Sequence, residues 1–507
     1  MKLQQGKGKS LIAKNVVINL GSQIVPMLAA LLTIPYVVKG LGTDGYGILS
    51  IAYMVLGYFS IFDLGLSRAT VKFVAEHLSP EKIHKVPEIV WTSLSLLVLL
   101  GFVFGGIAAI FVPLAVTHFF KMPASFVGQA KSSLLIICLS LPILLANDAL
   151  RGVLEAAQRF DLVNCIKIPG STCFYLFAAG AVALRLKVPW VIVALVLVRL
   201  VTACAYLAVG FRIIPELRAG IRVSRSALRS LATFGGWVMV SNICGPIFTY
   251  LERFFVASVV SVSMLTYYSI PFDLLSKTIM LPASLATALF PYFSHHGGGN
   301  SDLVTDVTSR SVKYLLFVMT PVTAVLLYFS KEILQLWMGA QFANQSAVVM
   351  QLLAAMFLLN ALSFVPYTSV QALGRPELKA KLDIAALPIY ALFLWLLVRP
   401  YGINGAAAAK LLITALDTGV LFLFAWKMKS FALRDCISGP LFRTLVASGA
   451  LLVLGFLIHV CRITLVNSAV LFGLCITAYA ILLWFAAVDG DEKTVIRSFS
   501  RVLLLKG

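Results

Sequence analysis

Charged residues are scarce in this chain: Asp, Glu, Lys and Arg together make up 12% of its 507 residues, while apolar residues reach 60%. The mean hydropathy is +0.95. A membrane-spanning helix needs about 20 consecutive apolar residues, and the sequence holds about 14 such runs with no connection long enough for a soluble domain. This composition excludes a soluble globular protein and predicts an all-α polytopic membrane protein with about 14 transmembrane helices.

Motif-forming cysteines are also missing. The chain has eight cysteines, and none lies at the spacing of a metal or redox motif. Most fall in or beside apolar runs, where a thiol acts as a small apolar side chain. We therefore expect no metal site and no bound cofactor. A cleavable signal sequence is not expected either, because the apolar run after the basic N-terminus is long enough to remain as the first span.

Acidic residues are half as frequent as basic ones, with 21 Asp and Glu against 41 Lys and Arg and a net charge of +20. Basic residues at the ends of apolar runs set orientation and contact anionic lipids, so this excess does not indicate a nucleic-acid partner. The loops opposite the N-terminal side hold few of these residues: Lys39, Lys121, Lys131, Arg185, Lys187, Lys331, Arg399 and Arg462. The positive-inside rule therefore predicts an even number of spans with both termini in the cytoplasm.

Acids are almost absent from those opposite loops, where Asp44 and Glu332 are essentially the only ones. A membrane-embedded glycosyltransferase, polymerase or ligase needs a sizeable outer loop that carries its catalytic residues. Acid/base chemistry would also need a second carboxylate in position. These loops are short, so we expect that the protein is not an enzyme.

An internal repeat divides the chain. The stretch LEAAQRFDLVNCIKI (Leu154–Ile168) lines up with VQALGRPELKAKLDI (Val370–Ile384) at a constant offset of 216 residues, counted from Leu154 to Val370. Pro26 is echoed by Pro246 at a similar offset. Two copies of six helices each are the simplest source of such a pattern, and an even number of spans per copy makes the two copies parallel.

The repeat sets the predicted domains. An N-terminal lobe is expected at residues 1–214 with helices 1 to 6, and a C-terminal lobe at residues 215–430 with helices 7 to 12. Residues 431–507 would add helices 13 and 14 outside the repeat. For two parallel lobes related by an axis along the membrane normal, a substrate site is expected between them.

Four cations fall inside predicted spans: Arg199, Arg253, Lys277 and Lys410. A charge near the bilayer centre costs about 2.5–3.5 kcal/mol on the insertion scale, so such residues usually face a bundle interior or a water-filled cavity. Local pairing is the alternative, because acids lie nearby at helical spacing: Glu252 beside Arg253, Asp273 one turn before Lys277, and Asp417 near Lys410. Arg199 has no acidic neighbour in its own helix.

Acids in or beside the spans have two readings that the sequence leaves open. Asp63, Glu252, Asp273 and Asp417 either make structural ion pairs or bind a coupling H⁺ or Na⁺. Arg151 lies three and four residues from Asp148 and Glu155, which favours mutual neutralisation there. The first helix instead carries polar uncharged groups, Asn15, Asn19 and Gln23, which need partners in lipid and should line the interior.

Three stretches resemble a known family. They are NVVINLGSQIVPMLAALLTIPYVVKGLGTDGYGILSIAYMVLGYFSIFDLGLSRA (Asn15–Ala69), YLERFFVASVVSVSMLTYYSI (Tyr250–Ile270), and the paired QRFDL and GRPEL elements. The sequence resembles the polysaccharide flippases (Wzx type) of the multidrug/oligosaccharidyl-lipid/polysaccharide (MOP) exporter superfamily over nearly its whole length. The resemblance implies a two-lobed, 12-helix transporter of the MOP flippase fold with two extra C-terminal helices.

The resemblance also implies a function. Such a protein would flip an undecaprenyl-diphosphate-linked oligosaccharide, an O-antigen or exopolysaccharide repeat unit, from the inner to the outer leaflet of the bacterial inner membrane by alternating access. The anionic diphosphate needs cationic ligands, and Arg199, Lys277, Lys410 and Arg253 are the candidates. In the related lipid II flippases, cavity cations receive the diphosphate; the uncharged first helix here disfavours a lipid II cargo.

Partners follow from the same resemblance. We expect the lipid-linked glycan and membrane lipids as ligands, a polymerase and other glycan-assembly proteins as further partners, and a monomer as the working state. A drug/cation antiporter of the MATE type stays open as an alternative. It would need an acid-rich cavity, whereas the charge at mid-depth here is mixed with a slight excess of cations.

Overall fold

The computed structural model describes residues 2–296, 301–461 and 465–488, apart from some side chains, chiefly those of residues 2–22 and 232–244. These ranges contain helices, turns and bends but no strand. The chain divides into two compact units, Met1–Ile270 with Leu394–Ala406 and Pro271–Phe393 with Ala407–Gly507. The lobe boundaries expected from the sequence stay a prediction.

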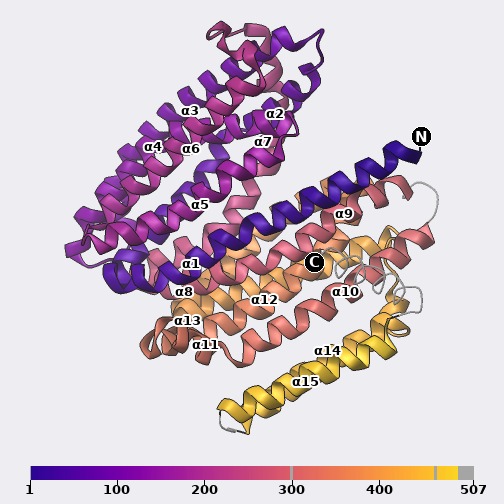
Figure 1. Ribbon diagram of the computed structural model, residues 1–507. Coiled ribbons are helices and arrows are strands. Elements are labelled where there is room, and N and C mark those ends of the chain that lie inside the picture. The colour runs from indigo at the N-terminus through magenta and orange to yellow at the C-terminus, as the bar shows by residue number, and fades with distance from the viewer. Residues whose placement is uncertain (1, 297–300, 462–464, 489–507) are drawn as a thin grey trace, which may run out of the picture. The chain divides into compact units, whose positions relative to one another are not determined.

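The helices of the first unit are α1 (Lys2–Phe59), α2 (Leu66–His77), α3 (Val86–Leu114), α4 (Ala124–Ala156), α5 (Phe160–Ala183), α6 (Val188–Ile213), α7 (Arg225–Phe255) and the start of α8 (Val262–Ser276). The second unit holds the end of α8, α9 (Met280–His296), α10 (Ser301–Tyr328), α11 (Ser330–Met338), α12 (Ala340–Ala372), most of α13 (Pro376–Lys427), α14 (Pro440–Val460) and α15 (Leu465–Ala486). Figure 1 labels them along the chain.

Two long helices are broken by glycines. Gly42 in α1 has φ 73° and ψ 170°, and Gly402 in α13 has φ 56° and ψ −130°. A positive φ is open to glycine at little cost, so each of these helices is really two. The break in α1 falls at the first residue of the polar sequence GTDG, residues 42–45. Eleven stretches of the described residues are long and apolar enough to span a membrane. The all-helical, multi-pass class is thereby confirmed, while the count of fourteen spans stays a prediction.

The repeat found in the sequence folds the same way in both copies. α4 and α12 are followed by a residue in the left-handed region, Gln158 with φ 56° and Gly374 with φ 80°. The next amide then bonds back into the helix, Arg159 N to Leu154 O at 3.0 Å and Arg375 N to Val370 O at 3.1 Å. These pairs keep the offset of 216 residues between Leu154 and Val370. The matching geometry supports a duplicated helical unit.

Glycines also set the packing of α3 on α4, two helices of the first unit that run alongside each other in Figure 1. A Cβ atom at Gly101 would lie 2.5 Å from Pro142 Cα, and one at Gly105 would lie 2.3 Å from the Cys138 carbonyl oxygen. Lipid gives no hydrophobic drive to helix association, so close backbone contact through small residues supplies it. The sequence GFVFG of Gly101–Gly105 is such a small-residue motif, and our sequence analysis did not single it out.

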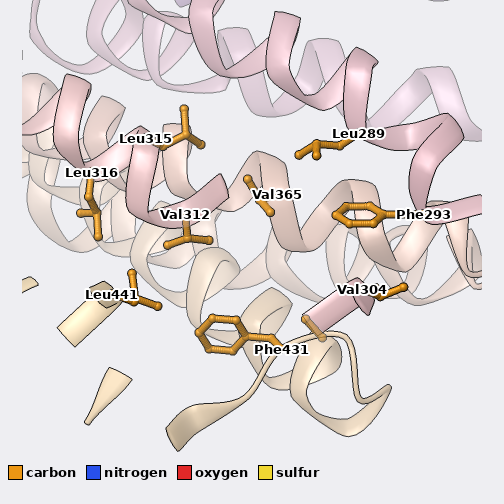
Figure 2. Close-up of a cluster of buried hydrophobic side chains, with 10 residues drawn as sticks. Leu289, Phe293, Val304, Val312, Leu315, Leu316, Val365, Phe431 and Leu441 are labelled. Carbon is orange, nitrogen blue, oxygen red and sulfur yellow. The ribbon is translucent and has the colours of Figure 1, made fainter. Parts of the chain in front are cut away.

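In the second unit, the described side chains include an apolar core shared by α9, α10, α12, α13, α14 and the segment before α14. Figure 2 shows Phe293, Val365 and Phe431 among the side chains gathered within it. α14 and α15 are further tied to α10 by polar contacts: the Tyr328 hydroxyl donates to Leu452 O at 2.5 Å, and Lys313 Nζ donates to Ala487 O at 3.0 Å. The C-terminal pair is therefore anchored to the unit by directional bonds as well as by packing.

Candidate functional site

A pocket of about 330 Å³ lies among α4, α5 and α6 of the first unit. Three cations line it, one from each helix: Arg151, Lys167 and Arg199. The rest of the wall combines hydroxyl, amide and aromatic groups: Asn147, Ser171, Phe174, Tyr175, Thr202 and Tyr206, with Gly170 and Val198. We call it the Arg199 pocket. It is a concave site in which an anion can meet positive charge and hydrogen-bond donors together.

The backbone at Arg199 is held in place by α4. The Asn147 amide, almost fully buried, donates to the Arg199 carbonyl oxygen at 3.0 Å and to Thr202 Oγ1 at 2.7 Å. α5 closes in at Gly170, where a Cβ atom would lie 2.5 Å from Thr202 Cγ2. An asparagine on one helix and a glycine on the next therefore fix α4, α5 and α6 around the pocket.

Arg199 and Lys167 carry the free positive charge of this pocket. The Arg199 side chain is exposed, and neither residue makes an ion pair within the part of the chain that the structure describes. Arg151 differs, because it lies 3.5 Å from an oxygen of Asp148 and 3.2 Å from an oxygen of Glu155. The neutralisation expected for Arg151 is thus formed, and the two unpaired cations stand beside it. The sequence did not reveal that Lys167 lies beside Arg199, because the two residues come from different helices.

Arg253, a second candidate ligand, is enclosed by protein. Glu252 and Arg253 sit in α7 with exposed fractions of 0% and 3%. The Arg253 guanidinium lies over the Tyr250 ring, 5.6 Å from its centroid, and Tyr250 packs against Tyr58 with 5.7 Å between ring centroids. A cation held over an aromatic face in a closed environment is stabilised locally. This burial favours the structural reading of Arg253 and Glu252.

Lys277 lies in the short helical turn Lys277–Ile279 between α8 and α9, and its side chain is exposed. Within the described residues it makes no ion pair, so the pairing with half-buried Asp273 that the spacing suggested is not formed. Lys277 belongs to the second unit, and the Arg199 pocket to the first. A shared headgroup site for Arg199, Lys277 and Lys410 stays a prediction.

The expected pairing of Lys410 with Asp417 is replaced by another. Lys410 is 9% exposed and lies over the Tyr390 ring at 5.1 Å from the centroid. Asp417 instead accepts from Lys379 Nζ at 2.6 Å, and the same ammonium donates to Asp383 at 2.8 Å. Sequence analysis missed this cluster, although the spacing of Lys379 and Asp383 by four residues was a usable signal. Asp417 is a partner of Lys379.

Asp63 has a local structural role. Its carboxylate accepts from the Ser67 amide at 3.1 Å and from the Ser67 hydroxyl at 2.5 Å, at the start of α2. An acid at a helix N-terminus satisfies free amides and complements the helix dipole. Of the polar residues expected to line a cavity, Gln23 is exposed, while the side chains of Asn15 and Asn19 lie outside the described residues.

Replacing Lys379 by methionine is expected to lower the stability of the protein by about 1–3 kcal/mol, because Asp383 and Asp417 then face each other without the ammonium that both contact. Lys381→Met removes a charge from an exposed side chain of the same helix and serves as the matched control. The apparent midpoint of thermal unfolding of the purified protein measures the effect. Equal midpoints for the two variants would show that the contacts of Lys379 with Asp383 and Asp417 do not stabilise the protein.

The described residues thus form a helical, multi-pass membrane protein with breaks at glycines and a cationic pocket among its helices. Two family sequence models match the chain: polysaccharide biosynthesis protein over residues 12–296 and MatE over residues 238–396. The first match covers more than half of the chain. The protein therefore belongs to the polysaccharide biosynthesis protein family, which confirms the family that the sequence resemblance indicated.

Individual relatives agree with this assignment. A Shigella flexneri protein named "Putative O-antigen transporter" is 28% identical over 414 residues, or 81% of this chain and 96% of the relative. Among solved structures, the inward closed lipid II flippase MurJ aligns with a TM-score of 0.70 at 14% identity over 93% of this chain and 99% of its own. An inward-facing multidrug resistance MATE transporter of the MOP superfamily also reaches 0.70 at 14% identity, over 82% and 98%. These structures support the MOP fold.

Proposed function

We propose that this protein is a flippase that moves an undecaprenyl-diphosphate-linked oligosaccharide from the inner to the outer leaflet of a bacterial inner membrane. The family match and the name of the Shigella flexneri relative support a lipid-linked glycan as cargo. The observation that carries the proposal is the Arg199 pocket, where unpaired Arg199 and Lys167 stand among hydrogen-bonding side chains. The diphosphate is the part of the cargo that needs both positive charge and hydrogen-bond donors.

The size of the pocket fits a headgroup better than a whole glycan. Pockets for drug-sized ligands run from about 300 to 1,000 Å³, and 330 Å³ lies at the lower end of that range. The guanidinium of Arg199 offers a planar fork to two phosphate oxygens, and Lys167 adds a point charge. The sugars would extend beyond the pocket. We therefore assign the pocket to the diphosphate and leave the glycan outside it.

The rival functions fit this pocket less well. A MATE-type drug/cation antiporter would need acids facing its cargo, whereas the unpaired charges of the Arg199 pocket are positive. A polymerase or ligase would need a pair of positioned acid/base groups. The two acids beside the pocket, Asp148 and Glu155, are instead committed to Arg151.

Coupling to H⁺ or Na⁺ is part of the proposal. In the second unit, Asp383 and Asp417 share the single ammonium of Lys379, which leaves one negative charge that a proton or a sodium ion can neutralise. We also propose a monomer as the working unit, and a glycan polymerase as the partner that takes the product on the outer side.

Orientation in the membrane is testable by cysteine labelling. With both termini in the cytoplasm, a cysteine at exposed Lys331 should react with an impermeant maleimide added to intact cells, and one at exposed Arg222 should not. Both are placed in a background without exposed native cysteines, and permeabilised cells give full labelling of each. Reaction of the Arg222 position from outside would reverse or refute the proposed topology.

Reconstitution tests the function itself. The purified protein in liposomes is given a fluorescent undecaprenyl-diphosphate oligosaccharide, and an impermeant reductant then bleaches the label on the outer leaflet. We expect exchange between leaflets well above that of protein-free liposomes, accelerated by an imposed H⁺ or Na⁺ gradient. Exchange equal to the protein-free rate would refute the flippase, and release of phosphate or free oligosaccharide would indicate an enzyme instead.

A further inference from the structure

A second basic pocket lies in the first unit, away from Arg199. Its volume is about 740 Å³, and it is formed where the first segment of α1, the start of α4 and the loop from α5 to α6 meet. Three cations line it, Lys39, Arg185 and Lys187. All three side chains are exposed, and none makes an ion pair within the described ranges of the chain. We call it the Lys39 pocket.

The walls of the Lys39 pocket are well defined. A Cβ atom at Gly40 would lie 2.0 Å from Val182 Cγ1, so α1 and α5 touch closely in its wall. The Arg185 amide donates to Val182 O at 2.8 Å, and the Val188 amide donates to the Gln129 side chain at 3.4 Å. α6 begins at Val188, so the partial positive charge of its N-terminus adds to that of the three cations.

The surroundings of this pocket suit a membrane interface. Tyr36, Leu184 and Trp190, which lie in or next to its wall, are large exposed side chains at 47%, 74% and 59% exposure. Tyr and Trp gather where hydrocarbon meets headgroups, and cations there meet lipid phosphates. The rise of about 1.5 Å per residue puts Lys187 roughly 18 Å from Arg199 along α6. The Lys39 pocket thus lies at the N-terminal end of α6, and the Arg199 pocket lies near the middle of that helix.

We propose that the Lys39 pocket binds the phosphate-bearing head of the lipid-linked glycan at the end of its passage, on the outer side of the membrane. This inference rests on the proposed flippase function and on the proposed orientation. A diphosphate that leaves the cations at Arg199 would lose their stabilisation, and a second set of unpaired cations at the interface lowers the cost of that transfer. Lys39, Arg185 and Lys187 are its ligands.

Photocrosslinking tests the proposal without requiring transport. The photoreactive residue p-benzoylphenylalanine replaces Phe126 in the wall of the Lys39 pocket, in protein held in phosphatidylcholine nanodiscs. A short-chain polyprenyl diphosphate is then added and crosslinked. The triple variant Lys39→Gln, Arg185→Gln, Lys187→Gln should lower the crosslink yield by at least about fivefold. The triple variant Arg218→Gln, Arg222→Gln, Arg225→Gln removes the same charge from exposed residues elsewhere and should leave the yield unchanged.

Further measurements distinguish a diphosphate site from a general site for anionic lipids. Phosphatidylglycerol should crosslink several-fold less than the diphosphate; an equal yield would mean a general anionic-lipid site and would overturn the proposal. An unchanged yield in the pocket variant would overturn it as well. Lys187→Gln alone repeats the test with a single substitution if the triple variant is poorly folded. Arg199→Ala should leave this crosslink yield unchanged. The assay therefore distinguishes a loss of transport from a loss of binding at the Lys39 pocket.

Discussion

Replacing Arg199 by alanine is expected to lower flipping of the lipid-linked glycan by about tenfold to a hundredfold, without loss of membrane insertion. Hydrogen bonds to a charged group contribute about 1.5–3 kcal/mol, and each 1.4 kcal/mol corresponds to about a factor of ten. The Arg199 side chain makes no ion pair among the described residues, so its removal leaves no orphaned acid to destabilise the fold. Arg199→Lys should restore part of the activity, because the charge returns but the planar fork does not.

The control for this prediction lies on the same helix. Arg212→Ala removes an exposed arginine near the end of α6, outside the Arg199 pocket, and should flip at the wild-type rate. Lys167→Ala should act in the same direction as Arg199→Ala. The bleaching assay in liposomes gives the rate, and surface glycan in cells, normalised to protein level, gives a second readout. Wild-type flipping by well-folded Arg199→Ala would remove Arg199 from the headgroup site.

The double variant Gly101→Ala, Gly105→Ala is expected to abolish stable accumulation of the protein. Each added methyl group would lie within 2.5 Å of α4 backbone atoms, which cannot rotate away as a side chain would. Overpacking of this kind costs about 1–3 kcal/mol per site, and separation of α3 from α4 would also disturb the helix that carries Asn147 and Arg151.

Gly106 provides the matched control, one residue beyond the motif. A Cβ atom there has no neighbour within 4 Å, so Gly106→Ala should be neutral or stabilising by up to about 1 kcal/mol, because alanine favours the helix. Size-exclusion profiles and apparent unfolding midpoints of the detergent-solubilised variants measure the difference. Equal behaviour of Gly105→Ala and Gly106→Ala would show that close α3–α4 contact does not hold the unit together.

The sequence predicted more of the fold than of the candidate functional site. Hydropathy was enough to predict the helical membrane class, and the repeat around Leu154 and Val370 was visible from residues shared at a constant offset. Ion-pair partners were harder to predict, because the spacing of residues along one helix indicates only which residues of that helix are neighbours. Lys379 meets Asp417 across 38 positions of the chain, a contact that the spacing of Asp417 from Lys410 could not reveal.

The Arg199 pocket shows the same limit. The sequence marked Arg199 because it had no acid in its own helix, and that observation holds among the described residues. It could not join Arg199 to Lys167, since the two come from different helices and meet only through the packing at Gly170 and Asn147. The small-residue contact at Gly101 was readable from the motif but was lost among the many apolar residues of that span.

The turns that follow α4 and α12 have the same shape but not the same residue. Gly374 adopts its left-handed conformation freely, whereas Gln158 does so against a steric cost of roughly 1–2 kcal/mol. The two turns therefore differ in how readily a substitution is accepted at this position. One copy already tolerates a side chain, and the other would take on a new strain with any replacement. The same shape is present in both turns, held by hydrogen bonds from the backbone amides of Arg159 and Arg375, which any residue except proline can donate.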